Sequence, residues 1–274
     1  MTDADGSPTF IDTHAHLDDG QFERDLDAVL TSARAVGVRH IINIGYRPER
    51  WETTIALAAR SAMVSFTLGV HPHHADEWSD ETGRRLLAVA TEHTPVAIGE
   101  IGLDYFRDFS DREVQRRALA AQLELASRLG LPVVFHLRGD VESDLLAILR
   151  DAPPVPAVFH SFDGSADLAD FALERGDIFG VGGLATRPSS TRLREIVARL
   201  PLDRIVLETD SPYLAPAGVR DRRNSPVNIP VIARSLAELK SAPLEQVAAA
   251  TTANAVRFFG LPAVLLEATP EAVG

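Results

Sequence analysis

The 274-residue sequence contains no cysteine, which excludes disulfide bonds and thiolate metal ligands and fits a reducing compartment. It also lacks any apolar run near the roughly 20 residues that a membrane-spanning helix requires. The first residues, Met1 to Pro8, are polar and acidic, unlike a signal peptide. These absences predict a soluble, cytoplasmic protein with no membrane partner.

Lysine is almost absent as well, because Lys240 is the only one in the chain. The formal net charge is −12, which argues against a long electropositive groove of the kind that binds duplex DNA. This charge leaves open a nucleic-acid substrate that is held at one small site by metal ions.

What the sequence does contain is a regular alternation of short apolar runs with longer helical ones. Eight strand–helix units of this kind predict parallel strands linked by helical crossovers, and a barrel of this type takes roughly 250 residues. We therefore expect an α/β fold, a single (β/α)8 TIM barrel with an extra C-terminal helix. The predicted strands are Phe10–Thr13, Val38–Ile44, Met63–Val70, Pro95–Gly99, Leu131–Phe135, Ala157–Phe159, Asp177–Val181 and Arg204–Leu207. The first predicted helix runs from about Phe22 to Ala35, and the last two cover Val227–Leu239 and Leu244–Phe259.

No linker or compositional break divides the chain. The sequence therefore predicts one barrel domain over residues 9–262, after a flexible leader over residues 1–8 and before a tail over residues 263–274.

Histidine and carboxylate residues collect where the predicted strands end. Barrel enzymes build their active sites at these ends. Seven of the nine histidines lie there, and His14 and His16 would point to one face because they are two residues apart on a strand. The residues at these ends are His14, His16, His71, His73, His74, Glu100, His136, His160 and Asp210.

Four of these histidines together with the two carboxylates already exceed the number of ligands that one tetrahedral zinc ion needs. They suit two cations roughly 3.5–4 Å apart that share a carboxylate and an activated water. Glu100, midway along the strand order, is the predicted bridge, because Lys240 lies far from any strand end and excludes a carbamylated lysine. Mixed histidine and carboxylate ligation suits zinc or manganese, and magnesium where oxygen ligands and water dominate.

Several segments, in order and at regular spacing from residue 10 to about 260, carry a resemblance to a known family. They are Asp12–Asp18, Gly69–His73, Ala97–Tyr105, Leu131–Arg138, Phe159–Gly164, Leu207–Pro216 and Arg222–Pro226. The sequence resembles the TatD family of metal-dependent deoxyribonucleases, which belongs to the amidohydrolase-like barrels.

The resemblance implies a role for each of these residues. His14, His16 and Asp210 would hold one ion, His136 and His160 the second, and Glu100 would bridge both. The catalytic residues would be Glu100, Asp210 as general base, and His71 at the substrate phosphate. Arginine's planar fork suits phosphate, and the loop after the last strand lies where barrels bind it. The expected substrate contacts are His71, His73, Arg138, Arg222, Arg223 and Asn224.

The implied activity is hydrolysis of phosphodiester bonds in DNA, from the 3′ end of a single strand, by a monomer active in DNA degradation or repair. An alternative is the hydrolysis of a small ester, lactone, amide or organophosphate on the same metal centre. A non-catalytic barrel is a third hypothesis, which predicts a lost ligand, and none is missing.

Several residues keep two interpretations at this point. Glu100 is either a ligand or a partner of Arg138. Asp12 and Glu208 either orient ligands or pack in the core, and His74 is either catalytic or a plain loop residue. Asp104 and Tyr105 either line the cleft or brace the loop.

Overall fold

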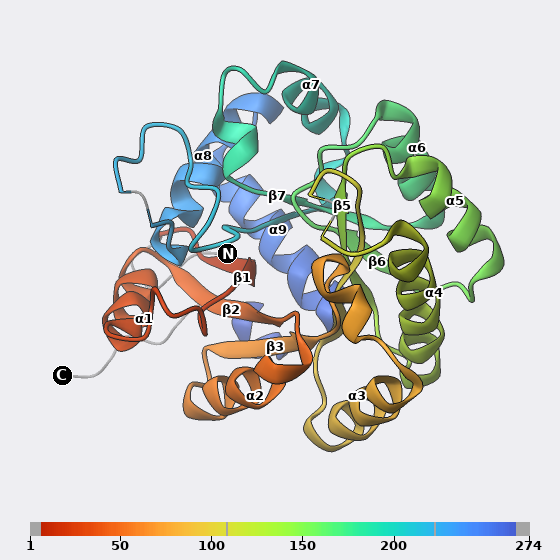
Figure 1. Cartoon of the computed structure of the whole chain (residues 1–274). Coiled ribbons are helices and arrows are strands. Elements are labelled where there is room, and N and C mark those ends of the chain that lie inside the picture. Colours follow the sequence, from red (N-terminus) through yellow and green to blue (C-terminus); the bar gives the residue numbers. More distant parts are fainter. Residues whose placement is uncertain (1–6, 108, 222, 267–274) are drawn as a thin grey trace. The chain divides into compact units, whose positions relative to one another are not determined.

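The computed structural model describes residues 7–107, 109–221 and 223–266. Within them, eight strands alternate with nine α-helices (Figure 1). The strands are β1 (Phe10–Ala15), β2 (Val38–Gly45), β3 (Val64–Leu68), β4 (Ala97–Asp104), β5 (Val133–Arg138), β6 (Ala157–Phe159), β7 (Ile178–Val181) and β8 (Ile205–Leu207). The helices are α1 (Leu26–Ala35), α2 (Trp51–Arg60), α3 (Asp80–His93), α4 (Arg112–Leu129), α5 (Glu142–Asp151), α6 (Ala166–Arg175), α7 (Thr191–Arg199), α8 (Ile229–Lys240) and α9 (Leu244–Phe259).

The strands follow one another in the sheet in chain order, from β1 to β8. This order, with a helix after each strand, confirms the predicted (β/α)8 TIM-barrel class and its extra C-terminal helix, α9. Residues 1–6 of the predicted leader and 267–274 of the predicted tail lie outside the described residues. The boundaries of a single domain stay a prediction.

By its packing the chain divides into two compact units. Unit 1 comprises the residues up to Asn43 and those from Phe179 onward, and unit 2 comprises Ile44–Ile178.

In unit 1 the first strand adjoins the last. β1 pairs in parallel with β2 and meets β8's continuation through a bridge between Ala15 and Ser211. Helix α9 is hydrogen-bonded to the start of each strand. Thr252 donates to the carbonyl of Thr9, just before β1 (3.1 Å), and Asn254 donates to that of Ile205 at the start of β8 (2.8 Å). The C-terminal ends of β1 and β8 therefore lie side by side.

In unit 2 the longest ladder joins β4 to β5, and it runs in parallel from Ile98 opposite Val133 to Asp104 opposite Arg138. The predicted ends of these strands, Gly99 and Phe135, were therefore too early. The ladder continues because the residues beyond those points stay paired, so that Glu100 and His136 lie within strands rather than at their tips.

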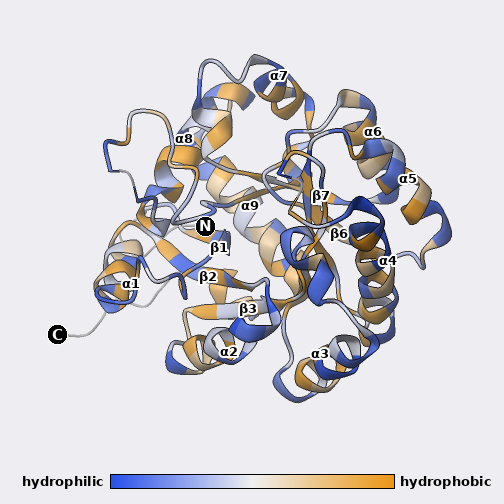
Figure 2. Ribbon diagram, viewed as in Figure 1, coloured by the Kyte–Doolittle hydropathy of each residue, from blue (hydrophilic) through white to orange (hydrophobic). Residues whose placement is uncertain are grey.

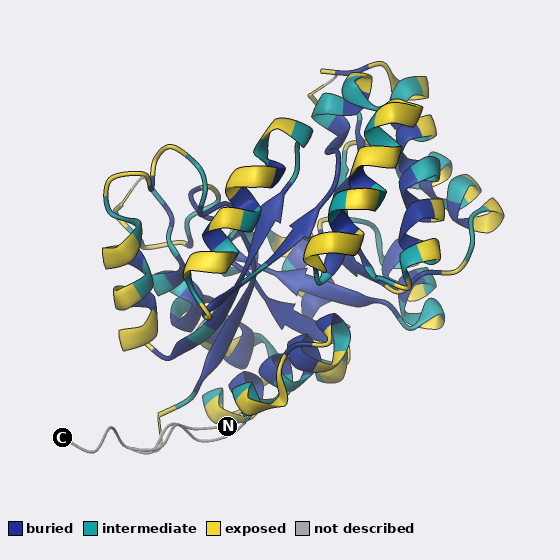
Figure 3. Cartoon of the chain, turned by 90° about the horizontal axis from the view of Figure 1, so that it is seen from below, coloured by how far each residue is buried: buried dark blue, intermediate teal, exposed yellow. Residues whose placement is uncertain are grey.

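The helices carry the pattern that this core requires. Figure 3 shows the strands buried and the helices with alternating buried and exposed turns, and Figure 2 shows blue and orange faces on helices such as α2 and α3. Helix α4 begins at the cap Asp111, whose Oδ1 accepts from the Glu113 N–H (2.8 Å), and ends at left-handed Gly130. No helix of the described chain has the length and apolar content that a membrane crossing requires.

Helix α1 begins four residues later than predicted, at Leu26 instead of Phe22. The Phe22 N–H bonds to the carbonyl of Asp19 (2.9 Å) and the Asp25 N–H to that of Phe22 (3.1 Å). These turns precede the helix and bury the Phe22 ring, which gives the segment its apolar periodicity without helical geometry.

Candidate metal centre

Unit 1 brings together three predicted ligands, His14 on β1, His16 directly after β1 and Asp210 just beyond β8. The Nε2 atoms of His14 and His16 lie 3.7 and 3.2 Å from Oδ1 of Asp210. The two imidazole rings are in edge contact, with centroids 5.2 Å apart. We call these three residues the β1–β8 cluster. Their side chains are largely shielded from solvent, which strengthens any electrostatic interaction among them.

Backbone hydrogen bonds hold Asp210 in an unusual conformation. Its φ is 57°, in the left-handed region, where a non-glycine residue typically stores roughly 1–3 kcal/mol of strain. Its N–H donates to the carbonyl of His14 (2.8 Å), and its own carbonyl accepts from the Tyr213 N–H (2.8 Å). Strain of this kind gathers at functional sites, and here it turns the carboxylate toward the two histidines.

Asn224 braces the loop that follows β8. Its Nδ2 donates to the carbonyls of Thr209 (2.8 Å) and Tyr213 (2.7 Å), and its Oδ1 accepts from Ser225 N–H and Asn228 Nδ2 (2.8 Å each). The side chain is fully buried. The contact of Asn224 with substrate stays a prediction, and its amide atoms are used within the loop.

Asp12 ties β1 to the end of β8. Its carboxylate accepts from the Thr209 hydroxyl (2.6 Å) and N–H (3.0 Å), and from the His14 N–H (3.3 Å). Burial raises the pKa of Asp12 to about 7, against the opposing effect of these hydrogen bonds. The contacts favour the packing interpretation of Asp12, since they join backbone and hydroxyl groups rather than an imidazole.

Unit 2 gathers a second set of predicted ligands around Glu100. Its Oε1 lies 2.7 Å from Nδ1 of His136, 3.7 Å from Nε2 of His160 and 3.8 Å from Nε2 of His71. We call these four residues the β4–β6 cluster. The donor atoms of Glu100, His136 and His160 lie within 4.8 Å of one another. Histidines therefore surround the Glu100 carboxylate, which supports the ligand interpretation of this residue.

Asp104, whose role the sequence left open, holds two histidines of unit 2 at once. Its Oδ2 lies 2.6 Å from Nε2 of His73 and 3.1 Å from Nε2 of His136. Its Oδ1 accepts from the N–H groups of Phe106 (2.9 Å) and Arg107 (2.8 Å). Asp104 lies four residues after Glu100 on β4, an even spacing that puts both on one face. That spacing was the sequence signal for its role.

These contacts set the protonation of the ring atoms. Burial alone would raise the pKa of the Asp104 carboxyl, but hydrogen bonds from His136 and His73 outweigh it and hold that pKa far below its usual range. Burial lowers the pKa of His136, and the carboxylates of Glu100 and Asp104 overcome this and raise it. Because Asp104 is ionised, the His136 Nε2 donates to it, and Nδ1 faces Glu100.

His71 is oriented by the backbone. Its Nδ1 accepts from the His73 N–H (3.1 Å), so the neutral ring carries its proton on Nε2. That Nε2 atom is the one on the side of Glu100.

The predicted arginine contacts differ in what holds them. Arg223 donates two hydrogen bonds to the Asp25 carboxylate (2.8 and 2.7 Å) and lies over the Phe22 ring at 4.9 Å. Arg138 lies on β5 two residues beyond His136, on the same face of the strand. Arg222 falls outside the described residues. The phosphate contacts of these arginines stay predictions.

The contacts of Tyr105 and His74 favour the structural interpretation of each residue over the functional one. Tyr105 donates through its hydroxyl to Asp144 (2.6 Å), which braces the loop after β4. His74 lies on the short 3-10 helix η2 (Pro72–Glu77), with Nδ1 3.6 Å from the Glu77 carboxylate. Neither of these two contacts involves Glu100.

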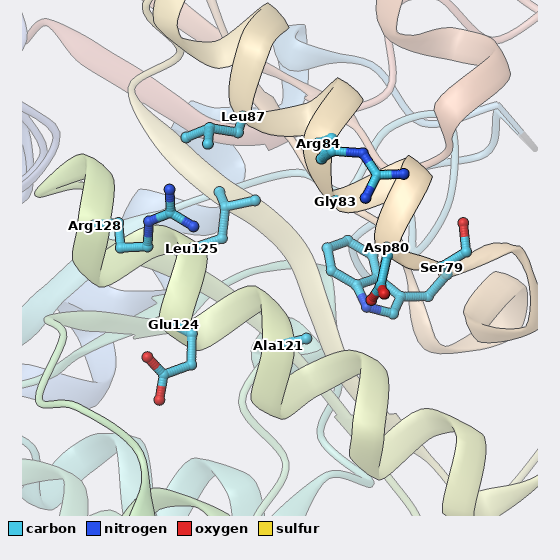
Figure 4. Close-up of a pocket in the computed structure, with 10 residues that line it drawn as sticks. Ser79, Asp80, Gly83, Arg84, Leu87, Ala121, Glu124, Leu125 and Arg128 are labelled. Atoms are coloured by element: carbon cyan, nitrogen blue, oxygen red, sulfur yellow. The ribbon is translucent and has the colours of Figure 1, made fainter.

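A pocket of about 300 Å³ lies elsewhere in unit 2, between α3 and α4 (Figure 4). Leu87 lines it from α3 and Leu125 from α4, and Trp78 also lines it. None of its lining residues is a predicted ligand, so it is separate from the β4–β6 cluster.

The donor sets fit divalent cations. Each unit presents imidazole nitrogens together with a carboxylate oxygen, which is the mixture that zinc and manganese accept in hydrolases. Structural zinc sites are closed by four ligands. The sets His14, His16 and Asp210 in unit 1 and Glu100, His136 and His160 in unit 2 each offer three donors, which would leave an open position for water or substrate.

Comparison with known proteins agrees with this chemistry. The family model described as TatD related DNase matches residues 11–260. The chain is 33% identical over 251 residues to the "Uncharacterized metal-dependent hydrolase YabD" of Bacillus subtilis, covering 91% of this chain and 98% of that protein. It is 39% identical over 257 residues to the "3'-5' ssDNA/RNA exonuclease TatD" of Cronobacter turicensis, covering 91% of this chain and 97% of that protein.

A solved structure gives the same result. The crystal structure of YJJV, a TatD homologue from Escherichia coli, superposes with a TM-score of 0.86 at 34% identity, covering 92% of this chain and 98% of that one. The resemblance found in the sequence is thereby confirmed, and this chain belongs to the TatD-related DNase family of metal-dependent hydrolases.

Proposed function

We propose that this hydrolase uses two divalent metal ions to cleave phosphodiester bonds, removing nucleotides from the 3′ end of single-stranded DNA or RNA. The observation that carries the proposal is the β4–β6 cluster, in which three histidines face one carboxylate oxygen. The name of the Cronobacter relative, a 3′-5′ exonuclease of single strands, supports the substrate. The net charge of −12 also favours a few nucleotides over a long duplex.

The ligand assignment follows the two clusters. His14, His16 and Asp210 would hold one ion, and His136 and His160 the other. Glu100 would be the carboxylate that the two ions share, since the C-terminal ends of barrel strands share one end of the fold. Zinc, manganese and magnesium are the candidate ions.

Two bound divalent cations would polarise a phosphoryl oxygen and lower the pKa of the attacking water. The protein's own groups have distinct tasks. Asp210 accepts the proton of the attacking water as general base. The backbone holds its carboxylate beside His14 and His16, the proposed ligands of one ion. His71 donates from Nε2 to a non-bridging phosphate oxygen, because its Nδ1 is occupied by the His73 N–H. Asp104 fixes the orientation of the His136 ring by accepting a hydrogen bond from its Nε2.

The test is cleavage of 3′-labelled and 5′-labelled single-stranded DNA and RNA, with magnesium, manganese or zinc. We expect the products to shorten progressively from the 3′ end. Glu100→Gln should reduce cleavage by about 10³-fold or more, because a shared carboxylate ligand is lost. The matched control is Glu124→Gln, an exposed carboxylate on α4, which should cleave as the wild type does.

A metal-loaded wild type that leaves every labelled strand intact would contradict the proposal. Turnover of small esters, lactones or phosphotriesters by the same preparation would then move the assignment to a small-molecule hydrolase.

A further inference from the structure

Exposed aromatic rings are rare in this protein. Among the described residues, three aromatic side chains are classed as exposed, Phe106 (67%), Phe109 (67%) and Tyr213 (46%). Phe106 and Phe109 belong to one short loop of unit 2, the β4–α4 loop (Tyr105–Arg107 and Phe109–Asp111). Single exposed apolar residues need no explanation, but two large exposed rings three residues apart in one loop do. We call Phe106 and Phe109 together the aromatic patch.

The loop that carries these rings is fastened at both ends. Gln115 donates through Nε2 to the carbonyls of Asp104 (3.2 Å) and Ser110 (2.8 Å). The Ser110 hydroxyl donates to the carbonyl of His73 (3.2 Å), and Asp104 accepts from the Phe106 N–H. Both ends of the loop are thus held in place while the two rings are exposed, an arrangement that lowers the entropic cost of binding a flat ligand.

The patch is continuous with the β4–β6 cluster. The Phe109 ring packs edge-on against His73, with centroids 4.8 Å apart. His73 contacts Asp104, and Asp104 contacts His136. A group resting on Phe109 therefore lies one imidazole away from the histidines around Glu100.

Positive charge accompanies the rings. The guanidinium of Arg107 lies 5.7 Å from the Phe106 ring centroid, and that of Arg112 lies 4.4 Å above the Tyr105 ring. Arginines interleaved with aromatic rings suit a ligand with both flat faces and phosphates, although Asp104 and Asp111 bring acidic charge to the same segment.

We propose that the β4–α4 loop is a stacking platform for unpaired nucleobases, on which Phe106 and Phe109 hold the bases of the strand that is cleaved. This inference rests on the proposed function and names how its substrate is selected. Every base has a π-face, so the platform accepts any sequence. Bases within a duplex are stacked on one another and cannot reach it, so the platform selects single strands.

The test measures KM and kcat on a 3′-labelled single-stranded 12-mer for Phe106→Ala, Phe109→Ala and the double variant. Each lost ring should raise KM by roughly 5- to 150-fold, the range that stacking on one aromatic side chain supports. The kcat should change by less than about threefold, because the rings hold the strand and not the reacting atoms. Phe109→Trp should restore KM, which a merely structural role of the ring would not predict.

The control is Val264→Ala, an apolar residue 63% exposed on the 3-10 helix η6 (Ala263–Leu266) of unit 1, whose KM should equal that of the wild type. Anisotropy of a labelled strand bound to the Glu100→Gln protein gives the same comparison without turnover.

Two results would overturn the platform. One is an active wild type whose KM is matched by the double variant. The other is a wild type that sediments as a dimer and a double variant that sediments as a monomer with an unchanged KM. The patch would then be covered by a second copy of the chain. A wild type that neither binds nor cleaves any strand would instead overturn the proposed function.

Discussion

The β1–β8 and β4–β6 clusters collect similar residues but hold them by different means. In the first, backbone hydrogen bonds and a left-handed turn place Asp210 against His14 and His16. In the second, the ionised side chain of Asp104 orients His73 and His136. Because backbone groups hold Asp210, replacing a neighbouring side chain should move it little, whereas a change that loosens the loop after β8 should displace it. Side-chain support depends on one carboxylate.

Among the changes that test this contrast between the clusters, the largest effect should follow from removing the Asp104 carboxylate. Asp104→Asn replaces an acceptor of four hydrogen bonds with an amide that also presents N–H donors to the imidazoles. We expect activity and affinity for the ion at His136 to fall by roughly 10- to 100-fold, the usual effect of losing the partner of a metal-bound histidine. Metal titrations and kcat measure this.

The control for this change is Asp177→Asn, a buried carboxylate of unit 2 that accepts from Arg175 (2.8 Å) and the Ala157 N–H (3.0 Å). It should lower stability while leaving ion affinity unchanged. Equal ion affinities in the Asp104 and Asp177 variants would remove the contrast between the clusters.

A smaller effect on the reaction, with a clear effect on folding, is expected at Asn224→Ala. The change leaves the buried carbonyl of Thr209 and the carbonyl of Tyr213 without their amide donor, at a cost of about 3 kcal/mol in the free energy of unfolding. The loop that turns Asp210 should loosen, so ion binding at the β1–β8 cluster should weaken. Urea unfolding and metal titration measure the two effects.

Asn254→Ala provides the matched comparison, because Asn254 also donates to two carbonyls, those of Leu202 (2.9 Å) and Ile205 (2.8 Å), at the start of β8, whereas Asp210 lies beyond its end. Asn254→Ala should lower the free energy of unfolding as much as Asn224→Ala does, and it should bind ions as tightly as the wild type. Weakened binding in both variants would mean that general destabilisation, and not the loop, controls Asp210.

The smallest effect concerns the pair of Arg223 and Asp25. If Arg223 reaches a phosphate, Asp25→Asn should free its guanidinium and lower KM for a single strand by a few-fold, and Arg223→Ala should raise KM. Hydrogen bonds from Arg223 lower the pKa of Asp25 below its ordinary 3.8. The pair therefore adds its small stability fully above about pH 4 and loses it as the pH falls further. An unchanged KM in both variants would make the pair purely structural.

The sequence identified the fold and the ligand types because both depend on local pattern. Alternating apolar runs and helices predict parallel strands, and a spacing of two residues puts His14 and His16 on one face. The exact ends of β4 and β5 depend on pairing with the neighbouring strand, which no single run records. Asn224 is predicted as a phosphate contact because arginines precede it, and only the folded loop shows its amide bonded within the loop.

Asp104 marks the same limit from the other side. Its spacing from Glu100 gave the face of the strand, but two histidines from other segments, at 73 and 136, create its role. Tertiary contacts of this kind are absent from local sequence patterns.

The most direct test of the account is the number of metal ions bound per chain after loading with manganese or zinc and desalting. We expect two ions for the wild type. We expect one ion for His14→Ala/His16→Ala and one for His136→Ala/His160→Ala, each with a thermal transition that shows a folded protein. A wild type that binds a single ion, or a double variant that stays folded and loses both, would contradict the claim that each cluster holds its own ion.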